Sequence, residues 1–325
     1  MGPVSSGVNN VNTEQFDIKT GVKQGCILSP LLFITTIDYL LKKEQENNHG
    51  IKMSEEQYLF DQDFADDIAL MDTTEERLQE ATNNIRHLAS KVGLIFNAKK
   101  CEVMNINKPG NLTIKIDDTV VKETDSFQYL GSTICANGDS HKEIMTRIGK
   151  AGAAFGNIQK ILQKGMLGLK NKLKIYQSLV LSILLYGCET WQIYAADQKK
   201  LDAFHTRCLR KILGITFKDR ITNEEIFRRT NQKTISEVIS ERRLRWLGHV
   251  WRMDPDRTAK KILNWIPPGG QRSRGRPRLS WKSNVEKDLE ATGTSWWQAE
   301  EEAQNRAGWR RRTARCVTMR HGRTK

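Results

Sequence analysis

The most informative segment of this 325-residue chain is Gln57-Tyr58-Leu59-Phe60-Asp61-Gln62-Asp63-Phe64-Ala65-Asp66-Asp67-Ile68-Ala69-Leu70-Met71. Two short apolar runs, 57–60 and 68–71, flank an acidic centre, a pattern typical of two antiparallel strands in a hairpin. If these strands bury the adjacent carboxylates of Asp66 and Asp67, the two charges repel each other unless a cation lies between them. Oxygen ligands without His or Cys favour Mg²⁺. The alternative is an exposed acidic turn, and the hairpin pattern alone favours it.

The sequence around the hairpin predicts helices on both sides of it. A Ser29-Pro30 step begins one helix, since Pro suits the first helical position, and the apolar pattern continues to Leu41. Thr73 or Thr74 caps a second helix over 75–92. Gly93 ends that helix.

Further apolar runs, separated by turns at Pro109-Gly110 and Asp117-Asp118, predict strands up to about residue 135. The chain to this point is therefore expected to be mixed α and β. The predicted strands cover 94–96, 101–106, 112–116 and 127–134.

After residue 140 the helical period replaces the strand pattern, so an all-helical region is expected. A Pro-Pro-Gly-Gly break at 267–270 precedes two final helices that hold four of the eight Trp residues. The expected segments are an irregular start (1–17), a mixed region (18–135), a helical region (136–251) and a basic C-terminal region (252–325). The predicted helices cover 141–164, 169–187, 195–213, 222–230 and 234–251.

Positive charge is concentrated at one end of the chain. Residues 1–240 hold 31 basic and 29 acidic side chains, whereas residues 241–325 hold 21 and 9, which together give the net charge of +14. A localised excess of this size is typical of a surface that binds nucleic acid, because neutralised phosphates release their counterions. The alternative is a basic tail that serves only solubility.

Several classes of protein and site are not expected. The longest apolar run, 179–186, is far shorter than a membrane span of ~20 residues, so no membrane partner is expected. The six Cys form no Cys-x-x-Cys pair and no signal peptide is evident, which favours an intracellular setting. Only Cys316 and His321 lie near the end of the chain, too few ligands for a zinc knuckle. Cys188, Cys208, His205 and His249 are expected to be packing residues.

Four motifs, in order along the chain, resemble those of reverse transcriptases. Phe64-Ala65-Asp66-Asp67 resembles the catalytic motif, and Gly25 to Pro30, within 20–30, resembles the preceding template- and nucleotide-binding motif. Residues 93–101 resemble the next motif, and Phe127 to Ser132 the primer grip. Segments 185–191, 243–250 and 274–277 are similar to non-LTR (LINE-type) retrotransposon polymerases of the RTE-like kind. The resemblance extends from about residue 18 to about residue 312.

The resemblance implies an α+β fold, with a partial reverse-transcriptase palm of antiparallel sheet and helices, an all-helical thumb and a basic helical C-terminal region. It implies an RNA-directed DNA polymerase, a nucleotidyltransferase that uses two metal ions, Mg²⁺ or alternatively Mn²⁺. The implied partners are an RNA template, a DNA primer or target, and dNTP. The implied location is the cytoplasm and nucleus, in the ribonucleoprotein of the element.

The resemblance also implies the roles of single residues. Asp66 and Asp67 are the expected metal ligands and catalytic residues, and Lys100, or alternatively Lys99, donates a proton to the departing pyrophosphate. The nucleotide- and template-binding residues are Gln24, Gly25 and Phe64, although Phe64 as plain core is the safer interpretation. The primer-grip residues are Tyr129, Leu130 and Gly131.

Arg274, Arg276 and Arg278 are the expected nucleic-acid-binding residues of the basic end. Arg-Gly-Arg-Pro resembles the core of short minor-groove binders, in which Gly allows close approach to DNA. A flexible linker that contacts phosphates without sequence preference is the favoured alternative.

The sequence departs from the family at one point. Reverse transcriptases carry a further catalytic aspartate in a strand upstream of the Gln24-Gly25 motif, and here only Asp17 precedes it, without the expected apolar strand. We therefore expect the C-terminal part of a longer polyprotein or the product of a decayed copy, with little polymerase activity of its own. The alternatives are a non-catalytic nucleic-acid-binding remnant and a protein without a cellular role.

Overall fold

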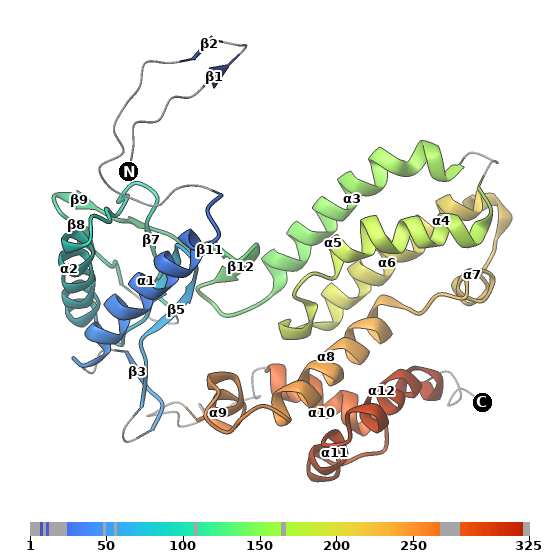
Figure 1. Cartoon of the computed structure of the whole chain (residues 1–325). Helices are drawn as coiled ribbons and strands as arrows, with labels where there is room; N and C mark the ends of the chain where they lie inside the picture. The colour runs from blue at the N-terminus through green and yellow to red at the C-terminus, as the bar shows by residue number, and fades with distance from the viewer. Residues whose placement is uncertain are drawn as a thin grey trace. The chain divides into compact units, whose positions relative to one another are not determined.

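A computed structural model describes residues 7–8, 11–12, 25–47, 50–54, 57–106, 110–163, 167–266 and 280–320 (Figure 1), with the side chains of 7–8, 11–12, 217 and 315–320 left out. The chain forms two compact units, the N-terminal unit (Met1–Asp125) and the C-terminal unit (Ser126–Lys325). The division falls ten residues before the expected end of the mixed region, and the names palm and thumb stay predictions. Among the described residues, no helix is long and apolar enough to span a membrane.

Two helices pack on the strands of the N-terminal unit. Residues of α1 (Ser29–Gln45), α2 (Glu75–Lys91) and the adjacent Phe60 build one core cluster. A second cluster contains Val103 and Ile114. The strands are β1 (Gly7–Val8), β2 (Val11–Asn12), β3 (Ile51–Lys52), β4 (Tyr58–Leu59), β5 (Asp61–Phe64), β6 (Asp67–Leu70), β7 (Glu102–Val103), β8 (Lys115–Ile116), β9 (Thr119–Val120) and β10 (Lys122–Glu123).

The predicted ends of α2 are confirmed. Thr74 is the N-cap, and its hydroxyl accepts a hydrogen bond from the backbone N–H of Arg77. Gly93, at φ +77°, follows the helix and takes the left-handed conformation that Gly adopts at low cost. The first predicted helix is also present, and α1 continues four residues beyond Leu41.

The strand predictions for 94–116 are largely wrong. No strand forms over 94–96, although Leu94 and Phe96 pack against the core clusters. Only two residues of each predicted strand, 101–106 and 112–116, enter a ladder, as β7 and β8. An apolar extended segment becomes a strand only where another backbone offers the ladder partners, and every sheet among the described residues has two strands.

The C-terminal unit begins with a hairpin where one strand over 127–134 was predicted. β11 (Ser126–Tyr129) pairs antiparallel with β12 (Ser132–Cys135), and Leu130 and Gly131 make the turn. Both turn residues have positive φ, +49° and +79°, as a type I′ turn requires. Leu at such a position is uncommon, so the sequence reads as an uninterrupted strand.

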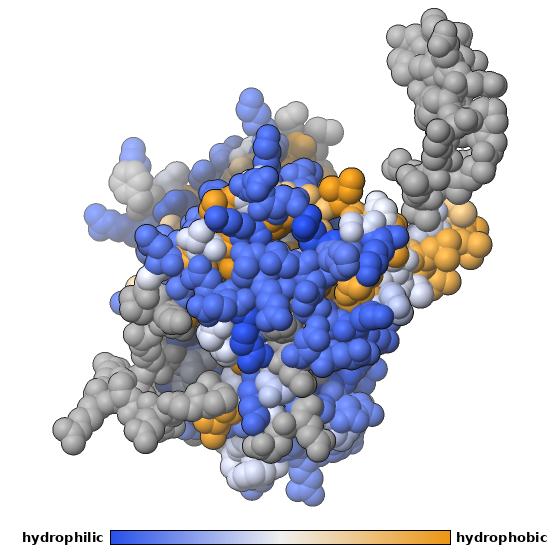
Figure 2. Space-filling model, turned by 90° about the vertical axis from the view of Figure 1, so that its left-hand side faces the viewer, coloured by the Kyte–Doolittle hydropathy of each residue, from blue (hydrophilic) through white to orange (hydrophobic). Residues whose placement is uncertain are grey.

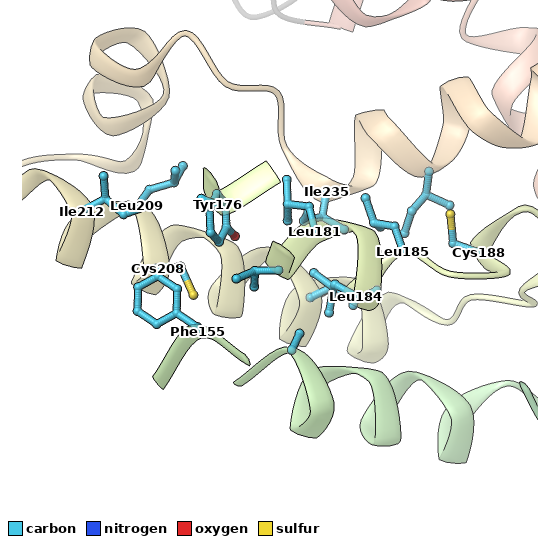
Figure 3. Packing of buried hydrophobic residues seen from close by; sticks show 14 of the residues in the cluster. Phe155, Tyr176, Leu181, Leu184, Leu185, Cys188, Cys208, Leu209, Ile212 and Ile235 are labelled. Atoms are coloured by element: carbon cyan, nitrogen blue, oxygen red, sulfur yellow. The ribbon is translucent and has the colours of Figure 1, made fainter. Parts of the chain in front are cut away.

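Helices make up the rest of the C-terminal unit, as predicted. One core cluster, shown in part in Figure 3, includes Phe155, Tyr176, Leu184, Cys208 and Ile235. The predicted helix over 169–187 is instead a helix with a π-helical turn. The elements are α3 (His141–Gln163), α4 (Leu169–Tyr176), the π-turn η1 (Gln177–Leu181), α5 (Ser182–Leu184), η2 (Cys188–Thr190), α6 (Ala195–Leu213), η3 (Phe217–Asp219), α7 (Asn223–Thr230) and α8 (Ile235–Trp251).

The last part of the chain packs on α8 through three tryptophans. Trp251 lies edge-on to Trp296 and Trp309, with ring centroids 5.3 and 5.9 Å apart. Three helices lie in the described residues from 280 onward, where two were predicted. Gly293 and Asn305 separate these short helices. The helices are α9 (Thr258–Asn264), α10 (Trp281–Glu290), α11 (Trp296–Ala303) and α12 (Arg306–Arg320).

Candidate functional site

The acidic hairpin is present, and both adjacent carboxylates lie at its tip. Phe64 of β5 pairs with Asp67 of β6, which leaves Ala65 and Asp66 as a two-residue turn. Ala65 has φ +57°, a left-handed conformation that costs a non-Gly residue roughly 1–2 kcal/mol. The turn therefore presents Asp66 at its end and Asp67 at the first position of the return strand.

Both carboxylates are exposed, which corrects the expectation that apolar strands bury them. The first predicted strand ended at Phe60, but β5 begins at Asp61, so the ladder runs through the acidic centre instead of flanking it. Solvation of both charges relieves their repulsion without a cation. Burial therefore supplies no argument for a metal ion here.

Asp61, at the base of the hairpin, is the more desolvated carboxylate. Burial raises its pKa above the ordinary aspartate value, and the charges of Asp63 and Asp38 act in the same direction. Gln45 of α1 opposes this rise, because its amide donates a hydrogen bond of 2.8 Å to Asp61 Oδ1. The same bond ties the base of the hairpin to the end of α1.

The donor set at the tip fits a magnesium ion only in part. Asp66 and Asp67 offer hard oxygen ligands, and Mg²⁺ in enzymes commonly takes one or two carboxylates together with water and substrate phosphates. Among the described residues, however, no three His, Cys, Asp or Glu lie close enough to hold a metal ion. A two-carboxylate site for a nucleotide-bound Mg²⁺ is therefore compatible with the hairpin, and a complete protein cage is not.

The other predicted residues of the N-terminal unit lie on its surface. Phe64 is 64% exposed, so its interpretation as plain core is wrong. Lys99 and Lys100 are both exposed in one turn, which does not distinguish between them. Gly25 is exposed, with φ +83°, shortly before α1. Gln24 lies outside the described residues.

Large apolar side chains are exposed around the start of α1. They belong to Ile27, Leu28, Leu31, Leu32 and Ile34, and each is more than half exposed. Apolar surface is visible among the hydrophilic surface in Figure 2. A contiguous apolar surface is uncommon on a monomer and typical of a contact surface.

The predicted primer-grip residues form the turn of β11 and β12 in the C-terminal unit. Leu130 and Gly131 are exposed and Tyr129 is half-buried. The carbonyl of Leu130 accepts a hydrogen bond of 2.9 Å from the Tyr186 hydroxyl, and that of Gly131 accepts one from the Arg147 guanidinium. Sequence reasoning assigned no role to Arg147, although Glu143 and Arg147 are opposite charges four residues apart at the start of α3, a pairing visible in the sequence.

Among the residues expected to pack, three are buried and one is not. His205, Cys208 and Cys188 are buried, as predicted. His249 is exposed on α8, where its ring lies 5.6 Å from that of Trp246, so its interpretation as a packing residue is wrong. Arg274, Arg276 and Arg278 lie outside the described residues.

Comparisons with known proteins show similarity to reverse transcriptases. Residues 4–134 match the model of the reverse transcriptase (RNA-dependent DNA polymerase) family. A transposon-derived protein of Caenorhabditis elegans is 28% identical over 240 residues, which are 70% of this chain and 84% of that protein.

Two longer relatives are also similar. The Pol polyprotein of the type-1 retrotransposable element R2 of Popillia japonica is 25% identical over 66% of this chain. The RNA-directed DNA polymerase of the mobile element jockey of Drosophila funebris is 24% identical over 61%. The matched regions are 37% and 22% of those two proteins, so this chain is similar to a minor part of each.

Proposed function

Because this chain is similar to the reverse transcriptases of non-LTR retrotransposons, we propose that it is by family an RNA-directed DNA polymerase and that its acidic hairpin carries the nucleotidyl-transfer site. One observation supports this most directly. Asp66 and Asp67 lie side by side at the exposed tip of an antiparallel hairpin, within the segment that matches the family model. The exposed tip leaves room for a nucleotide and a primer end.

Transfer of a nucleotide to a primer 3′ oxygen depends on positioning and on neutralised charge more than on covalent chemistry by the protein. In our proposal Asp66 and Asp67 hold Mg²⁺, or Mn²⁺, which neutralises charge on the triphosphate. Lys100, or Lys99, gives the proton from its Nζ to the departing pyrophosphate. Both lysines are exposed, as contact with a bound nucleotide requires.

The binding partners follow from the same proposal. Gly25 allows close backbone approach to the nucleotide, and Gln24 hydrogen-bonds a base or sugar. The exposed ring of Phe64 contacts the primer, and Tyr129, Leu130 and Gly131 grip it. The template is RNA and the primer is DNA, within an element ribonucleoprotein of the cytoplasm and nucleus.

We also propose that full activity needs a third acidic ligand on a further strand. β5 and β6 form a two-stranded sheet among the described residues, so a ladder edge is open to such a strand. The described carboxylates form no three-ligand group. Removing one ligand of a two-metal site typically lowers the rate by orders of magnitude, so this chain alone is expected to extend primers poorly.

Primer extension on an RNA template with Mg²⁺ tests these proposals. The chain is compared with a form lengthened upstream by a strand that carries an aspartate, each with and without Asp66→Ala. We expect extension mainly in the longer form and a loss of at least 100-fold on Asp66→Ala, because the principal metal ligand is removed.

Asp63→Ala is the matched control, since Asp63 is an exposed carboxylate of the same hairpin away from its tip. It should leave extension within a few-fold of the parent. Extension that survives Asp66→Ala would contradict the assignment of the site. Strong extension by the short chain would contradict the need for a third ligand.

A second function, non-catalytic binding of nucleic acid, is favoured by the charge distribution. Of the net charge of +14, residues 241–325 contribute +12 (21 basic minus 9 acidic). Arg306, Arg310 and Arg311 are exposed on α12. This binding needs no metal site and would persist in a copy that has lost its polymerase activity.

A further inference from the structure

Two side chains from outside the hairpin hold the turn between β11 and β12. The Tyr186 hydroxyl donates to the Leu130 carbonyl at 2.9 Å, and the Arg147 guanidinium donates to the Gly131 carbonyl. In a two-residue hairpin the carbonyls of both turn residues lie outside the ladder and need other partners. Here each turn carbonyl has a side-chain donor, Arg147 from α3 and Tyr186 from the turn that follows α5.

Arg147 is itself fixed in place. It is 6% exposed, and its Nε donates to Glu143 Oε1 at 2.6 Å. The other oxygen of Glu143 accepts the backbone N–H of Thr133, in β12, at 2.8 Å. The guanidinium also lies over the Tyr186 ring, 4.5 Å from its centroid. These bonds form a continuous network that links β12, two side chains of α3 and the turn.

Tyr186 is fixed by the buried segment on either side of it. Leu185 and Cys188 are buried in the core cluster, and the Leu185 carbonyl accepts a bond from Arg242 of α8. Gly187 follows with φ +69°, and a Cβ there would lie 3.1 Å from Ser132 Oγ, so a glycine permits this close approach. The packing of segment 185–191 therefore places the Tyr186 hydroxyl against the hairpin turn.

The backbone of the turn needs such support. Leu130 has φ +49°, a conformation that costs energy for a residue with a Cβ and persists only where the surroundings hold it. Leu130 is also 40% exposed, so packing around its side chain is incomplete. The two hydrogen bonds to the turn carbonyls supply that support.

We propose that Arg147 and Tyr186 are positioning residues, which hold the β11–β12 turn rigid so that it places the primer end for nucleotide addition. The inference rests on the proposed function, in which this turn grips the primer. Catalytic groups and substrates must be held to within about 0.5 Å of the productive geometry, and a misplacement of 1 Å can cost a hundredfold in rate. A turn on a short, two-stranded hairpin reaches that precision only when a packed core fixes it.

Hydrogen exchange tests the tether without any activity. Tyr186→Phe removes one hydroxyl and keeps the ring under Arg147. We expect amide exchange over 127–135 to accelerate at least fivefold, with α6 unchanged. The matched control is Tyr194→Phe, since Tyr194 is a similarly exposed tyrosine of the same unit whose hydroxyl is 3.4 Å from Gln192. Unchanged exchange over 127–135 in Tyr186→Phe would overturn the tether.

Photo-crosslinking tests the positioning. The full chain binds an RNA template and a DNA primer that ends in 4-thiothymidine, at equal amounts of bound primer for each variant. We expect crosslinks to 129–132 in the parent, and at least a threefold loss in Tyr186→Phe and in Arg147→Lys, because an ammonium group cannot serve both Glu143 and Gly131 as the planar guanidinium does. Tyr194→Phe should crosslink like the parent.

The outcomes separate the two proposals. Faster exchange over 127–135 without loss of crosslinks in the folded variants would mean a purely structural tether and would overturn the positioning role. Faster exchange with no parental crosslink at 129–132 would instead overturn the primer-grip assignment, and the positioning role with it.

Discussion

His205 shows how one buried residue makes the stability of the C-terminal unit depend on pH. Tyr176 and His205 Nδ1 are hydrogen-bonded at 2.8 Å, and His205 Nε2 lies 3.2 Å from the Lys233 carbonyl. This arrangement suits the neutral ring, with Nε2–H as donor and Nδ1 as acceptor. Burial lowers the pKa of His205 to about 4, against the weaker opposing effect of the Lys233 carbonyl.

We expect the free energy of unfolding to fall as the pH drops from 6.5 towards 4. In that interval the unfolded chain binds a proton at His205 that the folded chain does not. The folded state therefore has its full stability above pH 6.5 and loses the contribution of neutral His205 on acidification. The full effect is about 3 kcal/mol. All eight Trp lie at position 191 or beyond, so tryptophan fluorescence during urea unfolding reports on this unit alone.

His205→Phe is the control for this prediction. It keeps a ring between Tyr176 and Phe227, with which His205 stacks, and removes the titrating group. Other groups titrate in both proteins, so the difference between the two pH profiles isolates His205. Parallel profiles between pH 6.5 and 4 would contradict the prediction.

At the scale of elements, α8 and α12 pack so closely that one glycine is required between them. A Cβ at Gly248 of α8 would lie 2.2 Å from Nε1 of Trp309 in α12. That nitrogen donates to the Leu244 carbonyl at 2.9 Å, and the Trp309 ring is buried, so the ring cannot simply move aside. The close approach fixes the position of α12 along α8.

Gly248→Ala is therefore expected to destabilise the C-terminal unit by ~1–3 kcal/mol, since overpacking outweighs the gain in helix propensity. Gly149→Ala is the matched control, because Gly149 is an exposed helical glycine of α3 with nothing within 4 Å of an added Cβ. It should stabilise the unit by ~0.5–1 kcal/mol. Urea unfolding followed by tryptophan fluorescence measures both, and equal effects of the two substitutions would contradict the packing argument.

At the scale of the whole molecule, charge and apolar surface are unevenly distributed. The exposed apolar side chains at the start of α1 belong to the N-terminal unit, whereas residues 241–325 carry most of the net positive charge. We therefore expect nucleotide transfer from the N-terminal unit, and general affinity for nucleic acid from residues 241–325.

A salt titration of RNA binding tests this division. Each phosphate neutralised by Lys or Arg releases about 0.9 counterion on duplex DNA and about 0.7 on a single strand, so log K falls linearly with log salt concentration. We expect Arg306, Arg310 and Arg311, changed together to Gln, to make this slope shallower. Lys170, Lys174 and Lys199, exposed lysines of α4 and α6, are the matched control set. A slope that changes only with the control set would contradict the assignment of binding to the basic end.

Local sequence patterns were enough to predict the mixed and then helical order of the fold, most of the long helices of the C-terminal unit and the place of the acidic turn. These features rest on local causes: the 3.6-residue period, caps such as Thr74, and the order of the motifs. The resemblance to reverse transcriptases was also recognisable from the sequence, because the motifs that carry it are short and continuous.

Long-range packing settles which apolar runs become strands, how exposed each carboxylate is, and which side chains meet the hairpin turn. A ladder needs a partner backbone that local sequence does not specify, so 94–96 formed no strand and 127–134 formed two. Exposure of Asp66, Asp67 and Phe64 depends on what packs around the hairpin. The bond from Tyr186 to Leu130 joins residues 56 positions apart, and such a contact exists only once the hairpin and the segment after α5 have packed together.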